Sequence, residues 1–115
     1  MPADEIIDSA LKRGASKGLS ALSAVERKVW LISEAEVHCD KDGIDSFLDD
    51  YSSVLPEAAD AFEAVGATEI AQSLRSVHAV LPERRDDVLN HADKLITSRT
   101  GYDYDAIARF VSQTA

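Results

Sequence analysis

Residues 23–39 decide the fold, and they read SAVERKVWLISEAEVHC. Ser23 followed by Glu26 three positions later is a capping box, in which each side chain accepts a hydrogen bond from the other residue's backbone N–H. Apolar residues then recur every three or four positions, which is the period of one face of an α-helix. These signals predict a helix that begins after Ser23 and ends near Cys39. Its expected inward face comprises Val25, Val29, Trp30, Ile32 and Val37.

Comparable patterns predict helices on both sides of this segment. Gly14 and Gly18 are expected to bracket a loop, and Pro56 suits a first helical turn, where its missing N–H costs no hydrogen bond. Gly66 suits a left-handed helix end, and Thr68 suits the N-cap of the next helix. The other expected helices cover 3–12 or 3–13, 44–51, a segment from Pro56 to Gly66, 69–81, a segment through 88–96 that ends near 99–101, and a last one from 103 or 104. The inward residues expected of the 69–81 helix are Ile70, Leu74, Val77 and Leu81.

Strand signals are missing from the sequence. No β-branched run alternates with a period of two, and the three prolines and five glycines fall at expected helix ends. The predicted fold is therefore all-α, a compact bundle of six to seven short helices around one core. Residues 1–115 are expected to form a single acidic domain.

The composition is that of a compact soluble domain. The 115 residues are 45% hydrophobic and 29% charged, with a formal net charge of −9. No apolar run approaches the roughly 20 residues that cross a bilayer, the acidic N-terminal residues do not suit a secretory signal, and one cysteine excludes an internal disulfide. We therefore expect a cytoplasmic protein. Its acidity disfavours direct binding to nucleic acid or to an anionic membrane, since both bind basic surfaces.

The negative charge is concentrated in one part of the chain. Residues 40–70 hold nine carboxylates and one lysine, which gives −8 of the total −9. Carboxylates three or four residues apart share one helix face, so two acidic stripes are predicted there. The candidate partner-binding residues are Asp42, Asp45, Asp49, Asp50, Glu57, Asp60 and Glu63. Such a surface steers a cationic partner, or is simply the solvated side of two amphipathic helices.

The sequence disfavours three kinds of chemistry. Zinc needs four convergent ligands, whereas His38 and Cys39 are adjacent and point apart on a helix, with only His78 and His91 left to add. A calcium loop with Gly43 at its sixth position would begin at His38, which is no calcium ligand. No serine sits in a glycine-flanked elbow, and no glycine-rich loop is present to hold phosphate. We therefore expect no metal, no cofactor and no enzymatic activity.

Residues 20–82 resemble an all-helical bacterial family of unknown function that is named after a dimeric DNA-mimic protein. The family pattern has a capped helix that ends in Glu-Val, an Asn-Gly-Gly-Phe turn, a Gln-Tyr-Phe segment, an Asn, and later an Ile-Gly-Ala-like turn. The corresponding residues here are Leu22-Ser23, Glu26, Arg27, Trp30, Glu36-Val37, Asp42-Gly43-Ile44, Ser46-Phe47-Leu48, Asp50, Val65-Gly66-Ala67, Ile70, Ala71 and Leu74. The chain departs from the pattern at Asp42, Ile44, Ser46 and Asp50, so any site that these positions form in relatives is altered here.

The resemblance implies an acidic helical protein that occupies the DNA-binding face of a basic partner, such as a transcription factor. Successive carboxylates on a helix lie about 5–6 Å apart, near the spacing of successive phosphates. Size, acidity and helical content suit equally an immunity or antitoxin-like inhibitor of a basic toxin or nuclease. The two alternatives, a DNA mimic and an inhibitor of a toxin or nuclease, are both non-enzymatic.

Self-association is a further expectation. The sequence carries several aromatic residues that a small surface rarely exposes: Trp30, Tyr51, Tyr102, Tyr104 and Phe110. We expect residues 104–111 to be the segment that would cover a second subunit in a homodimer.

Overall fold

The computed structural model describes residues 2–77 and 79–114, which form seven α-helices and three short 3₁₀ helices and contain no strand. The predicted all-α class is therefore confirmed. The helices are α1 (Ala3–Lys17), η1 (Leu19–Ala21), α2 (Ala24–Lys41), α3 (Ile44–Tyr51), η2 (Ser52–Val54), α4 (Leu55–Ala64), α5 (Thr68–Ser76), η3 (Pro82–Arg84), α6 (Arg85–Thr97) and α7 (Tyr104–Thr114).

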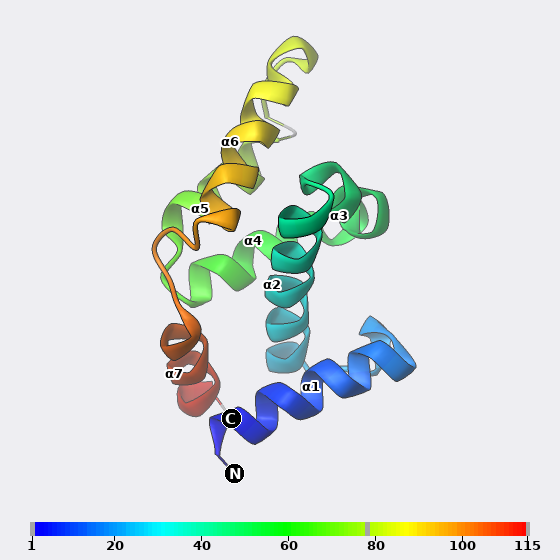
Figure 1. Ribbon diagram of the computed structural model, residues 1–115, viewed down its shortest axis with the longest axis vertical. Coiled ribbons are helices and arrows are strands. Elements are labelled where there is room, and N and C mark those ends of the chain that lie inside the picture. The colour runs from blue at the N-terminus through cyan, green and yellow to red at the C-terminus, as the bar shows by residue number, and fades with distance from the viewer. Residues whose placement is uncertain (1, 78, 115) are drawn as a thin grey trace.

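Helix α2 is the centre of the arrangement (Figure 1). It contacts α1, α3, α4, α6 and α7, while α5 packs between α4 and α6. All seven α-helices contribute to one cluster of buried side chains, in which Phe47 and Phe62 are the largest that are fully buried. The Cα radius of gyration is 13.6 Å, close to the value of about 13 Å expected for a compact chain of this length.

The capping box at the start of α2 is confirmed. The Glu26 backbone N–H donates to the Ser23 hydroxyl at 3.2 Å, and the Ser23 N–H donates to the Glu26 carboxylate at 2.9 Å. The prediction that Val37 faces inward was wrong, because its side chain is 54% exposed. At about 100° per residue, Val37 lies on the opposite side of α2 from Ala35 and Cys39, which are buried instead.

The expected loop at Gly14 was also wrong. Helix α1 continues through this glycine to Lys17, and the residue with positive φ that ends it is Gly18, at 85°. Gly14 is buried because the indole of Trp30 lies directly on it, and a Cβ there would approach Trp30 Cε3 to 2.5 Å. Glycine is therefore needed inside this helix for close packing and not for a turn.

Helices α3 and α4 begin as expected. Pro56 lies in the first turn of α4, and Gly66 ends this helix with a φ of 89°. The Ala67 N–H donates to the Phe62 carbonyl at 2.9 Å and the Gly66 N–H donates to the Glu63 carbonyl at 3.0 Å, which together form a Schellman motif.

Helix α5 departs from the prediction at both ends. The N-cap is Ala67 and no side chain bonds there, so Thr68 is the first helical residue and not the cap. The helix ends at Ser76, Val77 is buried as expected, and Leu81 is 62% exposed rather than inward. The segment expected to continue as helix passes through residue 78, which lies outside the described residues.

The last two helices are joined by residues 98–103. Helix α6 ends at Thr97, earlier than the expected 99–101, and Arg99 follows with a φ of 52°. The Thr100 N–H donates to the Leu95 carbonyl at 2.9 Å, as in a helix end that is normally closed by glycine. Helix α7 begins at Tyr104, as predicted, and the Asp103 carboxylate accepts a hydrogen bond from the Ala106 N–H at 2.8 Å.

We expect Gly14→Ala to destabilise the protein by about 1–3 kcal/mol, because the new methyl group must push the Trp30 ring away from α1. In an ordinary helix the same change would be stabilising, since alanine is favoured over glycine by about 1 kcal/mol. Urea unfolding followed by circular dichroism gives the difference, with Ser16→Ala on the exposed side of α1 as the control. A Gly14→Ala variant as stable as the parent protein would contradict the packing role.

Candidate protein-binding surface

Helix α3 presents a row of carboxylates to solvent. Ile44 and Phe47 anchor one side of the helix in the core, which leaves Asp45, Asp49 and Asp50 exposed on the rest. Asp45 lies in the first helical turn, where the positive end of the helix dipole stabilises an acidic side chain. Asp42 precedes the helix as the C-cap of α2 and is exposed as well. We call Asp42, Asp45, Asp49 and Asp50 the α3 acidic surface.

The α4 carboxylates are in a different state, because arginines pair with them. Arg27 of α2 holds both oxygens of Glu57, with N–O distances of 2.6 and 2.8 Å. Arg75 of α5 reaches Asp60 at 2.8 Å and Glu63 at 3.1 Å. These three carboxylates therefore already have cationic partners inside the chain.

By contrast, in the part of the chain that the structure describes, no lysine or arginine forms an ion pair with the α3 acidic surface. The seven candidate residues thus separate into four without such a partner and three with one. Sequence spacing placed both groups on helix faces but contained no signal for the pairing. The Arg27–Glu57 pair joins residues 30 positions apart, and no local pattern reports such a contact.

The Arg27–Glu57 pair is more enclosed than the pairs that Arg75 forms with Asp60 and Glu63. Both side chains are half-buried, and Arg27 also donates to the Leu19 carbonyl at 3.1 Å. Hydrogen bonding to Arg27 holds the pKa of Glu57 below its ordinary value. The same bond raises the pKa of Arg27. The pair fixes the start of α4 against α2.

Beneath the α3 acidic surface lies a chain of polar contacts. The Trp30 indole N–H donates to the Tyr51 hydroxyl at 3.1 Å, and Tyr51 donates to Glu34 at 2.9 Å. Burial, and then the hydrogen bond to Glu34, raise the pKa of Tyr51 to about 12. His38 contacts the hydroxyl of Ser46 at 2.7 Å. These contacts attach α3 to α2 from below.

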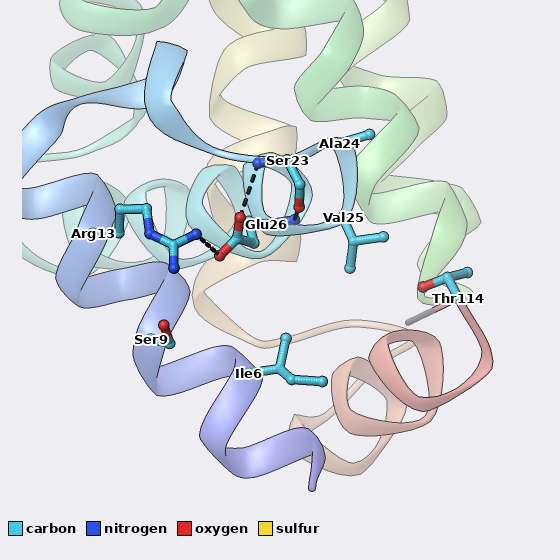
Figure 2. A pocket seen from close by; sticks show the side chains of 8 residues that line it. All are labelled: Ile6, Ser9, Arg13, Ser23, Ala24, Val25, Glu26 and Thr114. Carbon is cyan, nitrogen blue, oxygen red and sulfur yellow. Dashed lines mark hydrogen bonds and ion pairs between the residues drawn. The ribbon is translucent and has the colours of Figure 1, made fainter. Parts of the chain in front are cut away.

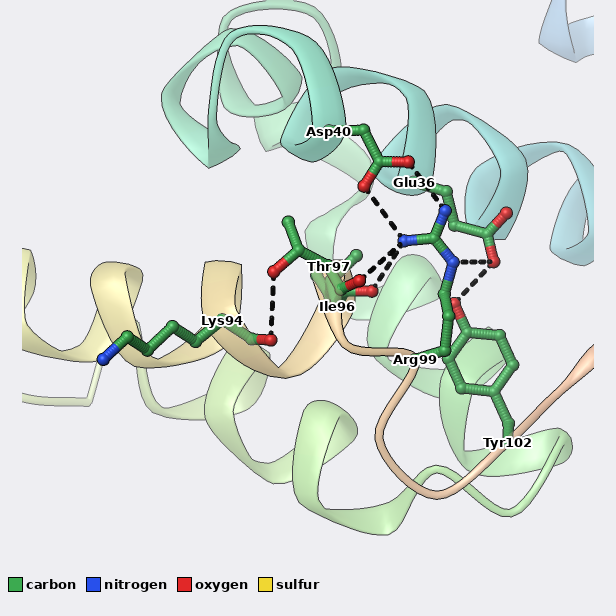
Figure 3. A network of polar contacts seen from close by, with 7 residues as sticks. All are labelled: Glu36, Asp40, Lys94, Ile96, Thr97, Arg99 and Tyr102. Atoms are coloured by element: carbon green, nitrogen blue, oxygen red, sulfur yellow. Dashed lines mark hydrogen bonds and ion pairs between the residues drawn. The ribbon is translucent and has the colours of Figure 1, made fainter.

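A second polar network joins α2 to the segment between α6 and α7 (Figure 3). Arg99 donates to both oxygens of Asp40, at 3.1 and 2.7 Å, and its Nε lies 3.3 Å from Glu36. The Tyr102 hydroxyl donates to the same Glu36 carboxylate at 2.6 Å. Burial, and then the bond to Glu36, raise the pKa of Tyr102. With its positive φ of 52°, Arg99 directs its guanidinium back toward α2. The bonds to Asp40 and Glu36 stabilise this backbone conformation, which is uncommon for residues other than glycine.

A pocket with a mainly apolar lining lies elsewhere, where α1, the start of α2 and the end of α7 meet (Figure 2). Its volume is about 480 Å³, and Ile6 and Val25 supply apolar walls. The Arg13–Glu26 ion pair, at 2.7 Å, stands at its side. None of the α3 acidic surface lines this pocket, so the two features are separate.

Helix α7 bears on the expected homodimer. Ile107 and Val111 are buried within the chain, where α7 packs against α1 and α2. The exposed Tyr104 donates to Asp4 of α1 at 2.7 Å. The apolar side of α7 is therefore already covered by its own chain, and the homodimer stays a prediction.

The described ranges, 2–77 and 79–114, hold no group of three or more His, Cys, Asp or Glu side chains arranged to bind a metal ion. No helix within the same ranges is long and apolar enough to cross a membrane. The single cysteine, Cys39, is a buried free thiol.

The fold and surface define an acidic all-helical protein with a helical acidic patch as its candidate site. A family model described as DMP19-like protein matches residues 20–113, so the chain belongs to the DMP19-like family. The expected resemblance is confirmed, and the match extends well past residue 82 to cover the C-terminal helices. The comparisons with curated proteins and with solved structures found no significant match.

The four positions that depart from the family pattern have distinct places in the structure. Ile44 is buried at the start of α3, and Asp42 ends α2. Ser46 and Asp50 both contact His38, at 2.7 and 3.7 Å. Three of the four replacements therefore lie on or directly beside the α3 acidic surface.

We expect Glu57→Gln to reduce stability by about 1 kcal/mol near pH 7 and by less near pH 3. A carboxyl whose pKa is lower in the folded chain stabilises the fold above its unfolded value, near 4.5, and loses that contribution as the pH falls through the folded value. Urea unfolding at the two pH values gives the comparison, with the exposed Glu69→Gln as control. An equal loss at both values would show that the charge of Glu57 is not responsible.

Tyr102→Phe is expected to cost about 1–2 kcal/mol, because it leaves a half-buried Glu36 carboxylate without one of its donors. Tyr104→Phe removes the same kind of bond, to Asp4, on the surface and is expected to cost clearly less than Tyr102→Phe. Thermal unfolding of both variants measures the contrast. Equal losses would mean that the network around Arg99 does not hold the α6–α7 segment.

Proposed function

We propose that this DMP19-like protein is a non-enzymatic binding protein whose α3 acidic surface docks on a basic protein, in the manner of a DNA mimic. The observation that carries the proposal is that the exposed carboxylates of α3 have no basic partner within the described chain. Asp45 and Asp49 are exposed one helical turn apart, and no lysine or arginine of the described chain pairs with them.

The spacing of Asp45 and Asp49 suits a partner protein whose own surface binds a polyanion such as DNA. Residues four positions apart on a helix have Cβ atoms about 5–6 Å apart. Duplex DNA carries about one negative charge per 1.7 Å of its axis, and proteins that bind it present lysine and arginine at matching density. A basic protein surface that binds a DNA groove would therefore meet a short row of negative charges on α3, as it does on DNA.

Helix α4 has a smaller part in the proposal than its sequence indicated. Glu57, Asp60 and Glu63 add three negative charges to the region, but Arg27 pairs with Glu57 and Arg75 pairs with both Asp60 and Glu63, so two of the three charges are compensated. A partner's arginine would first have to displace one of these internal cations. We therefore place the docking surface on α3 and treat α4 as its support.

The test begins with capture of the partner at low salt from a lysate of the cells that make the protein, followed by elution with a salt gradient. We expect a basic DNA-binding protein that elutes at moderate salt and that duplex DNA displaces from the α3 acidic surface. A basic nuclease or toxin whose activity is inhibited would instead support the immunity alternative. Absence of any basic partner would contradict both.

The location of the surface is tested by two variants that each remove two negative charges. Asp45→Asn with Asp49→Asn is expected to weaken binding of the captured partner by about tenfold or more. Asp60→Asn with Glu63→Gln, on α4, is the matched control and is expected to change affinity by less than about twofold. Isothermal titration calorimetry measures both, and equal effects would show that net charge alone, and not α3, determines binding.

A further inference from the structure

His38 occupies a special position beneath the α3 acidic surface. Its side chain, 18% exposed, projects from α2 toward α3 and lies edge-on to the rings of Phe47 and Tyr51. Its Nε2 lies 3.7 Å from Asp50 and 3.9 Å from Glu34, while Nδ1 contacts Ser46 at 2.7 Å. Two carboxylates and one hydroxyl thus surround a single imidazole.

The Ser46 hydroxyl can form a hydrogen bond with the His38 imidazole in both its neutral and its protonated form. A hydroxyl rotates, so it donates to Nδ1 of a neutral ring and accepts from Nδ1–H of a protonated one. In both states Nε2 faces Asp50 and Glu34 and can keep its proton toward them. His38 can therefore change charge without a change in the position of its ring.

The remaining charged groups near His38 do not compete for it. Glu34 also accepts the Tyr51 hydroxyl, which keeps that carboxylate in place. Helix α6 also packs against α2 and α3, and its Asp93 faces the thiol of Cys39 rather than His38. Among the described side chains that can carry positive charge, His38 is the one within ion-pair distance of an α3 carboxylate.

We propose that His38 is a proton-controlled internal counter-ion of the α3 acidic surface. When neutral, it leaves Asp50 available to a cationic partner. When protonated, it pairs with Asp50 and Glu34 and lowers the negative charge of the surface by one. Histidine is the side chain that commonly serves proteins as a proton-dependent charge switch. Docking is therefore expected to be weaker when His38 is protonated than when it is neutral. This inference rests on the proposed function, since it regulates the same surface.

The first test uses an acetylated octalysine peptide as the cationic probe, with affinity measured by calorimetry at pH 7.8 and 5.8 in dilute salt. One charge at about 4 Å in water changes an interaction by about fivefold, so we expect a threefold to fivefold weaker affinity at pH 5.8. His38→Gln should bind the peptide equally at both pH values. His91→Gln, exposed on α6, is the control and should keep the pH dependence of the parent protein. A His38→Gln variant that keeps the full pH dependence would overturn the proposal.

A second test needs no ligand and separates this inference from the proposed function. A double-mutant cycle of His38→Gln and Asp50→Asn is measured by urea unfolding at the same two pH values. We expect the two positions to be coupled about threefold in the unfolding equilibrium constant at pH 5.8, and uncoupled at pH 7.8. Coupling without peptide binding would support the His38–Asp50 pair and contradict the docking surface. No coupling at pH 5.8 would overturn the role of His38, whatever the peptide does.

Discussion

The contact between the Trp30 indole and Gly14 is the constraint on which the arrangement of the first three helices depends. The ring lies so close to α1 that a methyl group at Gly14 would approach it to 2.5 Å. From the other edge of the same ring, the indole N–H reaches Tyr51 at the end of α3. Trp30 of α2 therefore positions α1 on one side and α3 on the other. The α3 acidic surface thus lies on a helix that Trp30 holds in place.

Long-range contacts also determine which carboxylates have a basic partner. Three arginines, Arg27, Arg75 and Arg99, each neutralise carboxylates that are far away in the sequence. Within residues 40–70, the carboxylates without an arginine or lysine partner in the described chain are the four of the α3 acidic surface, with His38 beneath them, and Glu69 of α5. In this segment, which carries −8 of the net charge of −9, the carboxylates without such a partner are concentrated on and just before α3. This concentration is what makes α3 the candidate docking helix.

Local signals predicted the helices whose ends are set by local chemistry. The capping box at Ser23, the proline in the first turn of α4 and the glycine at 66 act within a few residues of themselves, and each lies where the sequence placed it. Val37 and Thr68 were misplaced within the local helix pattern itself. Elsewhere a distant residue overrides local preference. Gly14 stays helical because Trp30 covers it, and Arg99 adopts positive φ where Asp40 and Glu36 hold its guanidinium.

The sequence by itself determined the all-α class, the family pattern and the segment that carries most of the negative charge, because periodicity, caps and composition are local properties. Only the tertiary structure decided which carboxylates have a partner. Glu57 and Asp49 look alike in the sequence, yet one is held by an arginine 30 residues away and the other is exposed without such a pair. An ion pair depends on distance in space, and the packing of α2, α4 and α5 sets that distance.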